Sequence, residues 1–355
     1  MQPFEYNALP GRVVFGRGTI GQVKAEVEAL GASRALVITT AQQQASGADL
    51  LDRLGNCGAG LYAGAVMHTP IDVTEDAMQQ VAALDADCLV AVGGGSTIGL
   101  AKAIALRTDL PQVAVPTTYA GSEATPIVGQ TEGGIKTTQR GPKILPETIV
   151  YDVDLTITLP VDLTVTSGLN AIAHAVEGLY SREANPMISL LAEDGVRALV
   201  SALPRIVENP EDVEARSDAL YGSWACGVTL GVVGMALHHK LCHTLGGTFD
   251  LPHSQTHSVI LPHAMAYNAA HAPEAMARVA RAIRADDAAT GMWELAKKLG
   301  APMSLAELGM PGDGIDRAVE MVLANPYWNP APLEENRLRK LLEAAHFGSQ
   351  PIGAA

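Results

Sequence analysis

Histidines gather in one short stretch of the chain, Leu237–His263, which holds six of the ten histidines in the sequence. His239 and His243 stand four residues apart in a segment whose apolar residues follow a helical period. Both imidazoles should therefore leave the same side of a helix. Gly246–Gly247 is expected to end that helix, and Pro252 is expected to begin a second one.

The second helix repeats the spacing, because His253 and His257 are again one turn apart. Imidazole is the side chain that exchanges a proton near neutral pH, and it is a common metal ligand. Two helix ends that aim imidazoles at one place favour a catalytic or metal-binding site over a set of unrelated histidines. His238 lies about 100° from His239 around an α-helix and is expected to be a packing residue.

Composition limits the classes of protein that carry this stretch. The chain has 355 residues, 48% of them hydrophobic, which is typical of a globular protein of about two domains. Its net charge of -14 argues against nucleic acid or an anionic membrane as a partner, so an anionic ligand would need a local cationic pocket. The four cysteines form no CxxC pair and the N-terminus carries no export signal, so we expect reduced thiols and a cytoplasmic location.

One long segment, Ala219–Leu237, contains no charged residue and is nearly long enough to span a membrane. Four glycines interrupt it, and it leads directly into the histidine stretch. We expect it to be a core helix of a soluble protein, with its small residues allowing close backbone packing.

The first half of the chain alternates strand and helix patterns. Strands are predicted at Arg12–Phe15, Ala35–Thr39, Cys88–Val92 and Gln112–Val115, with helical periods between them. This alternation predicts a parallel sheet covered by helices. The later residues follow helical periods throughout, so the sequence predicts an α/β domain over residues 1–155 and an all-helical domain over residues 156–355.

Two turns follow predicted parallel strands, where α/β sheets bind ligands. The first is glycine-rich and opens a helix, which allows a pyrophosphate to approach the backbone amides closely, although the G-x-G-x-x-G fingerprint is absent. The second is rich in hydroxyls. Its Tyr119 could contact a ligand or simply pack. The expected cofactor-binding residues of the two turns are Gly93, Gly94, Gly95, Ser96, Thr117, Thr118, Tyr119 and Ser122.

Four motifs carry a resemblance that covers nearly the whole chain. They are VGGGS followed by a lysine after five residues, PTTYAGSE, GLNAIAHAVE, and the histidine stretch ending in ILPH. Together they resemble the iron-containing alcohol dehydrogenase superfamily, and within it the maleylacetate reductases look most similar. The resemblance implies a nucleotide-binding α/β domain, a helical domain, an active site in the cleft between them, and a homodimer.

The resemblance also assigns a metal site, with one departure. Metal-dependent members hold Fe²⁺ or Zn²⁺ with one aspartate and three histidines, and the matching positions here are Asn170, His174, His239 and His253. Asn170 supplies no charge to a cation. We therefore expect an enzyme that requires no metal, in which the three imidazoles carry protons and hold carboxylates, although three histidines alone can still bind zinc.

Other positions bear on the cofactor. Thr40 stands where many NAD-preferring relatives carry aspartate, so nothing repels a 2′-phosphate and either NADH or NADPH is expected to serve. Gly99 stands where the family commonly carries an acidic residue. Lys136 matches a hairpin lysine near the nicotinamide ribose, with a solvated loop lysine as the alternative. Glu177 is expected to support a helix or to orient a histidine.

The activity that the resemblance implies is NADH- or NADPH-dependent reduction of the conjugated C=C bond of maleylacetate, a dicarboxylate, to 3-oxoadipate in the degradation of aromatic compounds. His243 is the expected proton donor or substrate anchor, with His253 as the alternative. A metal-dependent alcohol dehydrogenase acting on a short alcohol or aldehyde is the competing enzyme. A histidine-rich metal-binding protein is the non-enzymatic alternative, and it leaves both turns unexplained.

Overall fold

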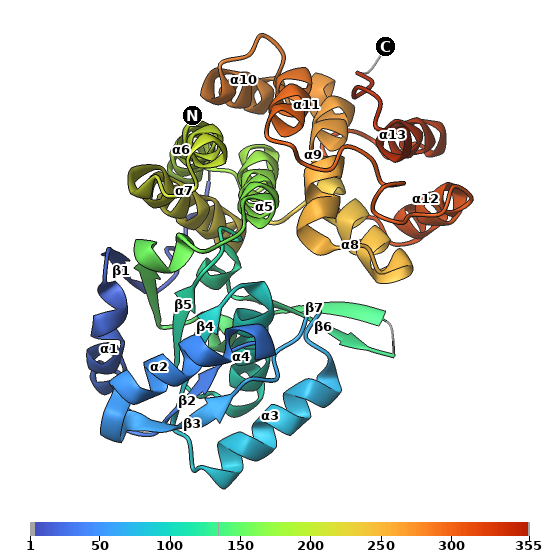
Figure 1. Ribbon diagram of the computed structural model, residues 1–355. Helices are drawn as coiled ribbons and strands as arrows, with labels where there is room; N and C mark the ends of the chain where they lie inside the picture. The colour runs from blue at the N-terminus through green and yellow to red at the C-terminus, as the bar shows by residue number, and fades with distance from the viewer. Residues whose placement is uncertain (1–3, 134, 354–355) are drawn as a thin grey trace. The chain divides into compact units, whose positions relative to one another are not determined.

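The computed structural model describes residues 4–133 and 135–353 (Figure 1). The chain forms two compact units, one made of Ala8–Leu159 and the other mainly of Pro160–Ala355. The first unit is an α/β domain and the second is helical, which confirms the predicted fold class.

The first unit is built on a six-stranded parallel sheet in the order β1-β8-β5-β4-β2-β3. Its inner strands β2, β4 and β5 are buried along their whole length, as continuous apolar runs in a parallel sheet usually are. The strands are β1 (Arg12–Gly16), β2 (Ala35–Ile38), β3 (Gly58–Tyr62), β4 (Cys88–Gly93), β5 (Gln112–Pro116) and β8 (Thr148–Asp152).

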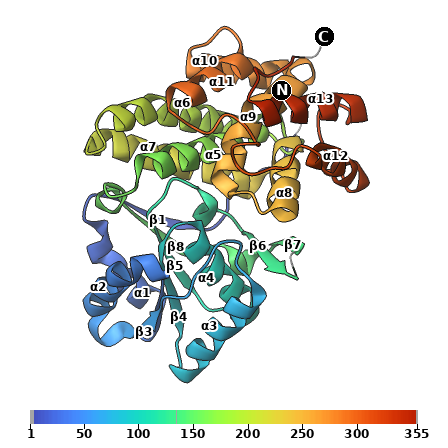
Figure 2. The same ribbon diagram turned by 45° about the vertical axis from the view of Figure 1, so that its right-hand side comes forward.

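Helices cover both faces of this sheet because successive strand residues point to opposite sides. In β2, Ala35 and Val37 join the core under α1 and α2, whereas Leu36 and Ile38 join the core under α3 and α4 (Figure 2). The four helices are α1 (Val23–Ala29), α2 (Gln44–Leu54), α3 (Ile71–Ala83) and α4 (Gly95–Thr108). A separate antiparallel hairpin consists of β6 (Ile127–Glu132) and β7 (Ile135–Arg140).

Short 3-10 helices connect the larger elements of both units. They are η1 (Thr19–Gln22), η2 (Ala41–Gln43), η3 (Gly55–Cys57), η4 (Ser122–Ala124), η5 (Pro142–Ile144), η6 (Val153–Thr156) and η7 (Ala269–His271).

The helical unit is arranged around α5 (Val161–Tyr180), which is buried over most of its length and packs against α6, α7 and α9. A Cβ atom on Gly195 of α6 would lie 3.2 Å from the carbonyl oxygen of Gly222 of α7, so these two helices meet at backbone distance. The other helices are α6 (Pro186–Glu208), α7 (Val213–Val232), α8 (Leu237–Phe249), α9 (His253–Asn268), α10 (Pro273–Ile283), α11 (Ala288–Lys298), α12 (Gly314–Ala324) and α13 (Glu335–Phe347).

The structure differs from the sequence prediction at the end of α8. Gly246 and Gly247 do not break the helix, which continues to Phe249. Each glycine costs a helix about 1 kcal/mol relative to alanine. Leu241 and Leu245 are fully buried on the same helix, and their burial outweighs that cost.

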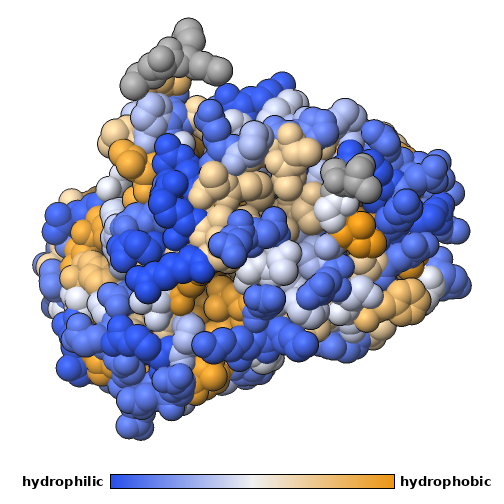
Figure 3. Space-filling view, turned by 90° about the horizontal axis from the view of Figure 1, so that it is seen from above, coloured by the Kyte–Doolittle hydropathy of each residue, from blue (hydrophilic) through white to orange (hydrophobic). Residues whose placement is uncertain are grey.

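Within the described part of the chain, no single helix is long and apolar enough to cross a membrane, and only the pair α7 and α8, bent by 96°, passes that test together. Seen from above, the surface is mostly hydrophilic, and its apolar residues form small separate groups (Figure 3).

Candidate active site

Three polar side chains line one face of the buried helix α5. Asn170, His174 and Glu177 follow one another at helical spacing, and none is more than 4% exposed. Because solvent does not reach them, their hydrogen bonds must be made within the protein or to a ligand.

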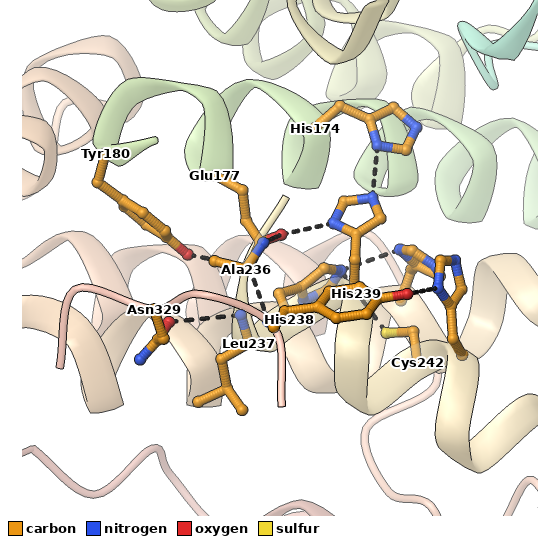
Figure 4. A network of polar contacts seen from close by, with 12 residues as sticks. His174, Glu177, Tyr180, Ala236, Leu237, His238, His239, Cys242 and Asn329 are labelled. Atoms are coloured by element: carbon orange, nitrogen blue, oxygen red, sulfur yellow. Dashed lines mark hydrogen bonds and ion pairs between the residues drawn. The ribbon is translucent and has the colours of Figure 1, made fainter. Parts of the chain in front are cut away.

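Glu177 connects α5 to the start of α8. Its carboxylate accepts hydrogen bonds from the backbone amides of Ala236 at 2.8 Å and of His238 at 2.7 Å (Figure 4). These amides belong to the first turn of α8, where a helix has no carbonyl partners of its own and favours a negative charge. The prediction that Glu177 supports a helix or orients a histidine is confirmed.

The same carboxylate fixes the ring of His239. Oε2 of Glu177 lies 2.7 Å from Nδ1 of His239, and a carboxylate oxygen can only accept, so the ring proton is on Nδ1. The lone pair of His239 is therefore on Nε2. A carboxylate behind an imidazole in this way is the usual second layer of a metal site.

His239 faces the residues of α5. Its Nε2 lies 2.8 Å from Nδ1 of His174, and Nε2 of His174 lies 3.5 Å from Nδ2 of Asn170. The amide oxygen Oδ1 of Asn170 is buried and has no hydrogen-bond partner. The four side chains form one continuous polar chain from Glu177 to Asn170, with an unused oxygen at its end.

A second buried pair lies beside the first. Nε2 of His238 lies 2.9 Å from Nδ1 of His257, and Sγ of Cys242 lies 3.7 Å from the same nitrogen of His238. Burial, followed by the neighbouring imidazoles, lowers the pKa of both His238 and His257 well below the usual value, so both rings are neutral at pH 7. His238 is buried, as expected of a packing residue, but it also makes a polar contact that the sequence did not indicate.

The remaining predicted histidines join this cluster. The ring centroid of His253 lies 4.3 Å from that of His257, and the ring centroid of His243 lies 6.0 Å from that of His239. The structure thus brings together the residues predicted from the sequence as catalytic: Asn170, His174, His239, His243 and His253.

Tyr327 contacts the cluster from the loop between α12 and α13, and the sequence gave no signal for it. Its hydroxyl lies 3.2 Å from Nδ1 of His243. Burial, and then the charge of Glu177, raise the pKa of Tyr327, so it remains a hydroxyl at neutral pH. Two residues further on, Oδ1 of Asn329 accepts from the amide of Leu237 at 3.3 Å, which attaches the loop to α8.

The predicted cofactor turns lie in the α/β unit. Thr40 follows β2, Gly93–Ser96 joins β4 to α4, and Thr117 follows β5. These strands are neighbours, and the sheet order reverses between β2 and β4, which is where open α/β sheets bind ligands. Gln43 was not predicted from the sequence. Its Nε2 donates to Oγ1 of Thr117 at 3.1 Å and links the segment after β2 to the turn after β5.

The glycines of the turn between β4 and α4 differ in the space around them. A Cβ atom on Gly94 would lie 2.9 Å from the methyl carbon of Thr118, so the two turns touch there. A Cβ atom on Gly95 would meet nothing within 4 Å. The N-terminus of α4 is thus open at Gly95, as an approach of phosphate to its amides requires.

The lysine that follows the VGGGS motif, Lys102, stabilises the hydroxyl-rich turn after β5. It is 1% exposed, and Nζ donates to the carbonyl oxygens of Thr125 at 2.7 Å, of Ile127 at 3.1 Å and of Ser122. Tyr119, for which both roles were open, is fully buried.

Lys136 lies in β7 opposite Thr131, and its side chain lies outside the described part of the structure. A Cβ atom on Gly99 would lie 2.7 Å from Oγ1 of Thr69, so a side chain at this position would require Thr69 to move.

Comparison with known proteins agrees with this architecture. Residues 10–153 match the family described as iron-containing alcohol dehydrogenase, and residues 164–346 match the C-terminal part of the Fe-containing alcohol dehydrogenase family. The chain belongs to the iron-containing alcohol dehydrogenase family. It is 55% identical over 351 residues to a maleylacetate reductase from Sphingobium indicum, covering 99% of both chains.

Solved structures give the same result. A maleylacetate reductase from Agrobacterium tumefaciens matches with a TM-score of 0.95 and 53% identity, covering 99% of this chain and 100% of that one. An iron-containing alcohol dehydrogenase from Corynebacterium glutamicum matches with a TM-score of 0.93 and 45% identity, covering 98% and 97%.

Family membership corrects the prediction that no metal is required. The family is defined by iron, and the Corynebacterium neighbour is itself an iron-containing enzyme. The loss of one carboxylate at Asn170 does not remove the ligand set, because an amide oxygen can also bind a cation and three histidines can hold zinc. The buried, unpartnered Oδ1 of Asn170 and the carboxylate behind His239 both fit a metal. A second set, His238, Cys242 and His257, has ligand atoms within 4.8 Å of one another.

Proposed function

We propose that this chain is a maleylacetate reductase, which uses NADH or NADPH to reduce the C=C bond of maleylacetate to 3-oxoadipate. The observation that carries the proposal is identity above 50% to maleylacetate reductases over the full length of both chains. The buried histidine cluster on α5, α8 and α9 supports it, since it offers the proton donors that the reaction needs.

The chemistry sets two tasks for the protein. When bound, the nicotinamide supplies a hydride to the alkene carbon β to the ketone, and the electrons of the double bond move onto the ketone oxygen as an enolate. The protein must then stabilise a negative oxygen and deliver one proton to the α carbon. One hydride and one proton complete the reduction.

His243 suits the proton transfer. Its Nδ1 lies 3.2 Å from the hydroxyl of Tyr327, and an imidazole can give or take a proton near neutral pH. His253 is the alternative donor. The ring of His239 lies next to His243, with 6.0 Å between the ring centroids, and His239 in turn contacts His174.

The same cluster also contains the residues that would bind a metal ion. Asn170, His174, His239 and His253 would hold it, with Glu177 fixing the ring of His239. Bound Fe²⁺ or Zn²⁺ would supply Lewis acidity toward a substrate oxygen.

For the cofactor, we propose residues 1–155 as the binding domain and residues 156–355 as the catalytic domain. The open amides at Gly95, the neighbouring Ser96 and the hydroxyl-rich turn at Thr117 and Thr118 would contact the pyrophosphate. Lys136 of the hairpin would lie near the nicotinamide ribose. Thr40 carries no carboxylate against a 2′-phosphate, so NADPH should be accepted beside NADH.

We also propose a cytoplasmic homodimer. The four cysteines are buried, and none forms a disulfide in the described structure, which supports a reducing compartment. Light scattering on the purified protein would measure the oligomeric state.

The test is an assay of NADH oxidation with the enzyme loaded with Fe²⁺ or Zn²⁺. Maleylacetate should give a kcat/KM at least a hundredfold above that of a short aldehyde. A higher kcat/KM with the aldehyde would contradict the proposal and favour the alcohol dehydrogenase alternative.

A further inference from the structure

A dicarboxylate substrate, which is the class that the proposed function requires, must find positive charge in a chain whose net charge is -14. The two helices that carry most of the histidine cluster, α8 and α9, contain no aspartate or glutamate. Their single lysine or arginine is Lys240. These two helices thus contribute one fixed cation, and it lies between His239 and His243 in the sequence.

Lys240 and His243 contact the same aromatic ring. Nζ of Lys240 lies 5.6 Å from the ring centroid of Tyr327, and the hydroxyl of that tyrosine lies 3.2 Å from Nδ1 of His243. Lys240 is half-buried, and within the described residues no carboxylate lies at ion-pair distance from its Nζ. A partly desolvated cation without an internal counter-charge attracts an external anion more strongly than a solvated surface lysine does.

The loop that carries Tyr327 is held on both sides. The guanidinium of Arg182 lies 5.3 Å from the ring centroid of Trp328. Asn329 exchanges side-chain hydrogen bonds of 2.9 and 2.7 Å with Asn268 of α9. Three consecutive loop residues therefore contact α8, α9 and the segment that follows α5, and the position of the Tyr327 ring is set before any ligand arrives. Preorganised groups bind with a smaller loss of entropy.

We propose that Lys240, the hydroxyl of Tyr327 and His243 form a subsite that binds one carboxylate of the dicarboxylate substrate. Lys240 supplies the charge and Tyr327 supplies a neutral donor. The carboxylate that is held there fixes the substrate beside the ring of His243. This inference rests on the proposed function only for the identity of the substrate, because the subsite recognises the carboxylate group itself.

The first test compares Lys240→Met with Lys240→Arg. A hydrogen bond to a charged group contributes about 1.5 to 3 kcal/mol, so the methionine variant should raise the KM for maleylacetate by about tenfold to a hundredfold. Its kcat and its KM for NADH should stay within about twofold. The arginine variant should recover most of the affinity, and Tyr327→Phe should cause a smaller rise in KM.

Lys297 provides a matched control. Its Nζ lies 5.0 Å from the ring centroid of Trp293, so it makes the same kind of cation–π contact on α11 of the same unit. Lys297→Met should leave the KM for maleylacetate unchanged. An equal rise in both methionine variants, or no rise in Lys240→Met, would overturn the subsite.

The second test measures binding without chemistry, by calorimetric titration of adipate onto the protein in the absence of NADH. Wild type and Lys297→Met should bind adipate alike, and Lys240→Met at least tenfold more weakly. Absence of saturable binding to wild type, or equal binding to Lys240→Met, would overturn the subsite. A wild-type protein that binds adipate through Lys240 yet fails to reduce maleylacetate would contradict the proposed function and leave the subsite intact.

Discussion

One buried carboxylate organises the residues of the site. Glu177 satisfies two amides at the start of α8 and fixes the proton of His239, so the same side chain positions a helix and sets the chemistry of a ring. Only an acceptor with two oxygens can do both, since these three partners are donors, as is the hydroxyl of Tyr180 at 3.3 Å from Oε1.

We therefore predict a combined loss in Glu177→Gln. The amide nitrogen would face a backbone N–H or the Nδ1 proton of His239, and a buried donor without a partner costs about 1 to 3 kcal/mol. The free energy of unfolding, measured in urea by tryptophan fluorescence, should fall by at least this amount. The affinity for Zn²⁺ should fall about tenfold to a hundredfold. Glu183→Gln is the control, because Glu183 is exposed and accepts from Gly234 at 3.2 Å, and it should change stability by less than about 1 kcal/mol.

A second prediction for single residues distinguishes a histidine that transfers a proton, His243, from a histidine that packs, His238. His243→Ala should lower kcat by about two orders of magnitude, the usual contribution of general acid catalysis, with little change in stability. His238→Ala should instead lower the free energy of unfolding, because it opens a cavity beside His257 and Cys242. Steady-state kinetics and urea unfolding of both variants measure the difference. A larger fall in kcat for His238→Ala than for His243→Ala would refute these assignments.

At the scale of elements, the turn between β4 and α4 can be tested without disturbing the fold. Gly95→Val places its side chain in open space, whereas a Cβ atom on Gly93 would lie 2.5 Å from Oγ1 of Thr97. The valine should block the close approach of the pyrophosphate to α4 and raise the KM for NADH about tenfold or more. The matched control is Gly11→Val, which also has no neighbour within 4 Å and lies outside the turns. An unchanged KM for NADH in Gly95→Val would remove the basis for placing the cofactor there.

The elements also show what sequence patterns can and cannot predict. Continuous apolar runs identified β2, β4 and β5, because strands buried on both faces need no polar residue. β8 was not predicted, although its residues Ile149–Tyr151 form a similar buried run; only its place in the sheet depends on pairing with β1, which lies far away in the sequence. The same limit applies to Tyr327. It reaches His243 across 84 residues from a loop without periodicity, so only the folded chain places it in the site.

The glycines of α8 show a different limit. Local propensity predicted that Gly246 would end the helix, and tertiary packing extended it by three further residues to Phe249. The histidine spacing nevertheless predicted the cluster correctly, because one-turn spacing brings His239 and His243 to the same side wherever the helix ends.

For the whole molecule, stability must be followed unit by unit. The two units have separate cores, and all three tryptophans, Trp224, Trp293 and Trp328, lie in the helical one. Tryptophan fluorescence therefore reports the unfolding of the helical unit. This unit also contains the buried histidines, so its stability should depend on pH in the acid range.

His263 allows that dependence to be predicted. It is 2% exposed, neither ring nitrogen has a hydrogen-bond partner, and burial lowers its pKa from 6.5 to about 4. Between these values the unfolded chain binds a proton that the folded chain does not. The free energy of unfolding should therefore fall as the pH falls from 6.5 toward 4, by about 3 kcal/mol for this group alone.

His263→Leu should remove that part of the pH dependence. The difference in the free energy of unfolding between pH 7 and pH 4.5 should shrink by about 2 to 3 kcal/mol, measured by urea titration with tryptophan fluorescence at both pH values. At pH 7 the variant should be at least as stable as wild type, because leucine buries no unpartnered nitrogen. The control is His271→Leu, whose exposed ring meets solvent in both states and should leave the difference unchanged. If His263→Leu keeps the full pH dependence of wild type, the acid sensitivity belongs to His238 and His257 instead, whose pKa values burial also lowers.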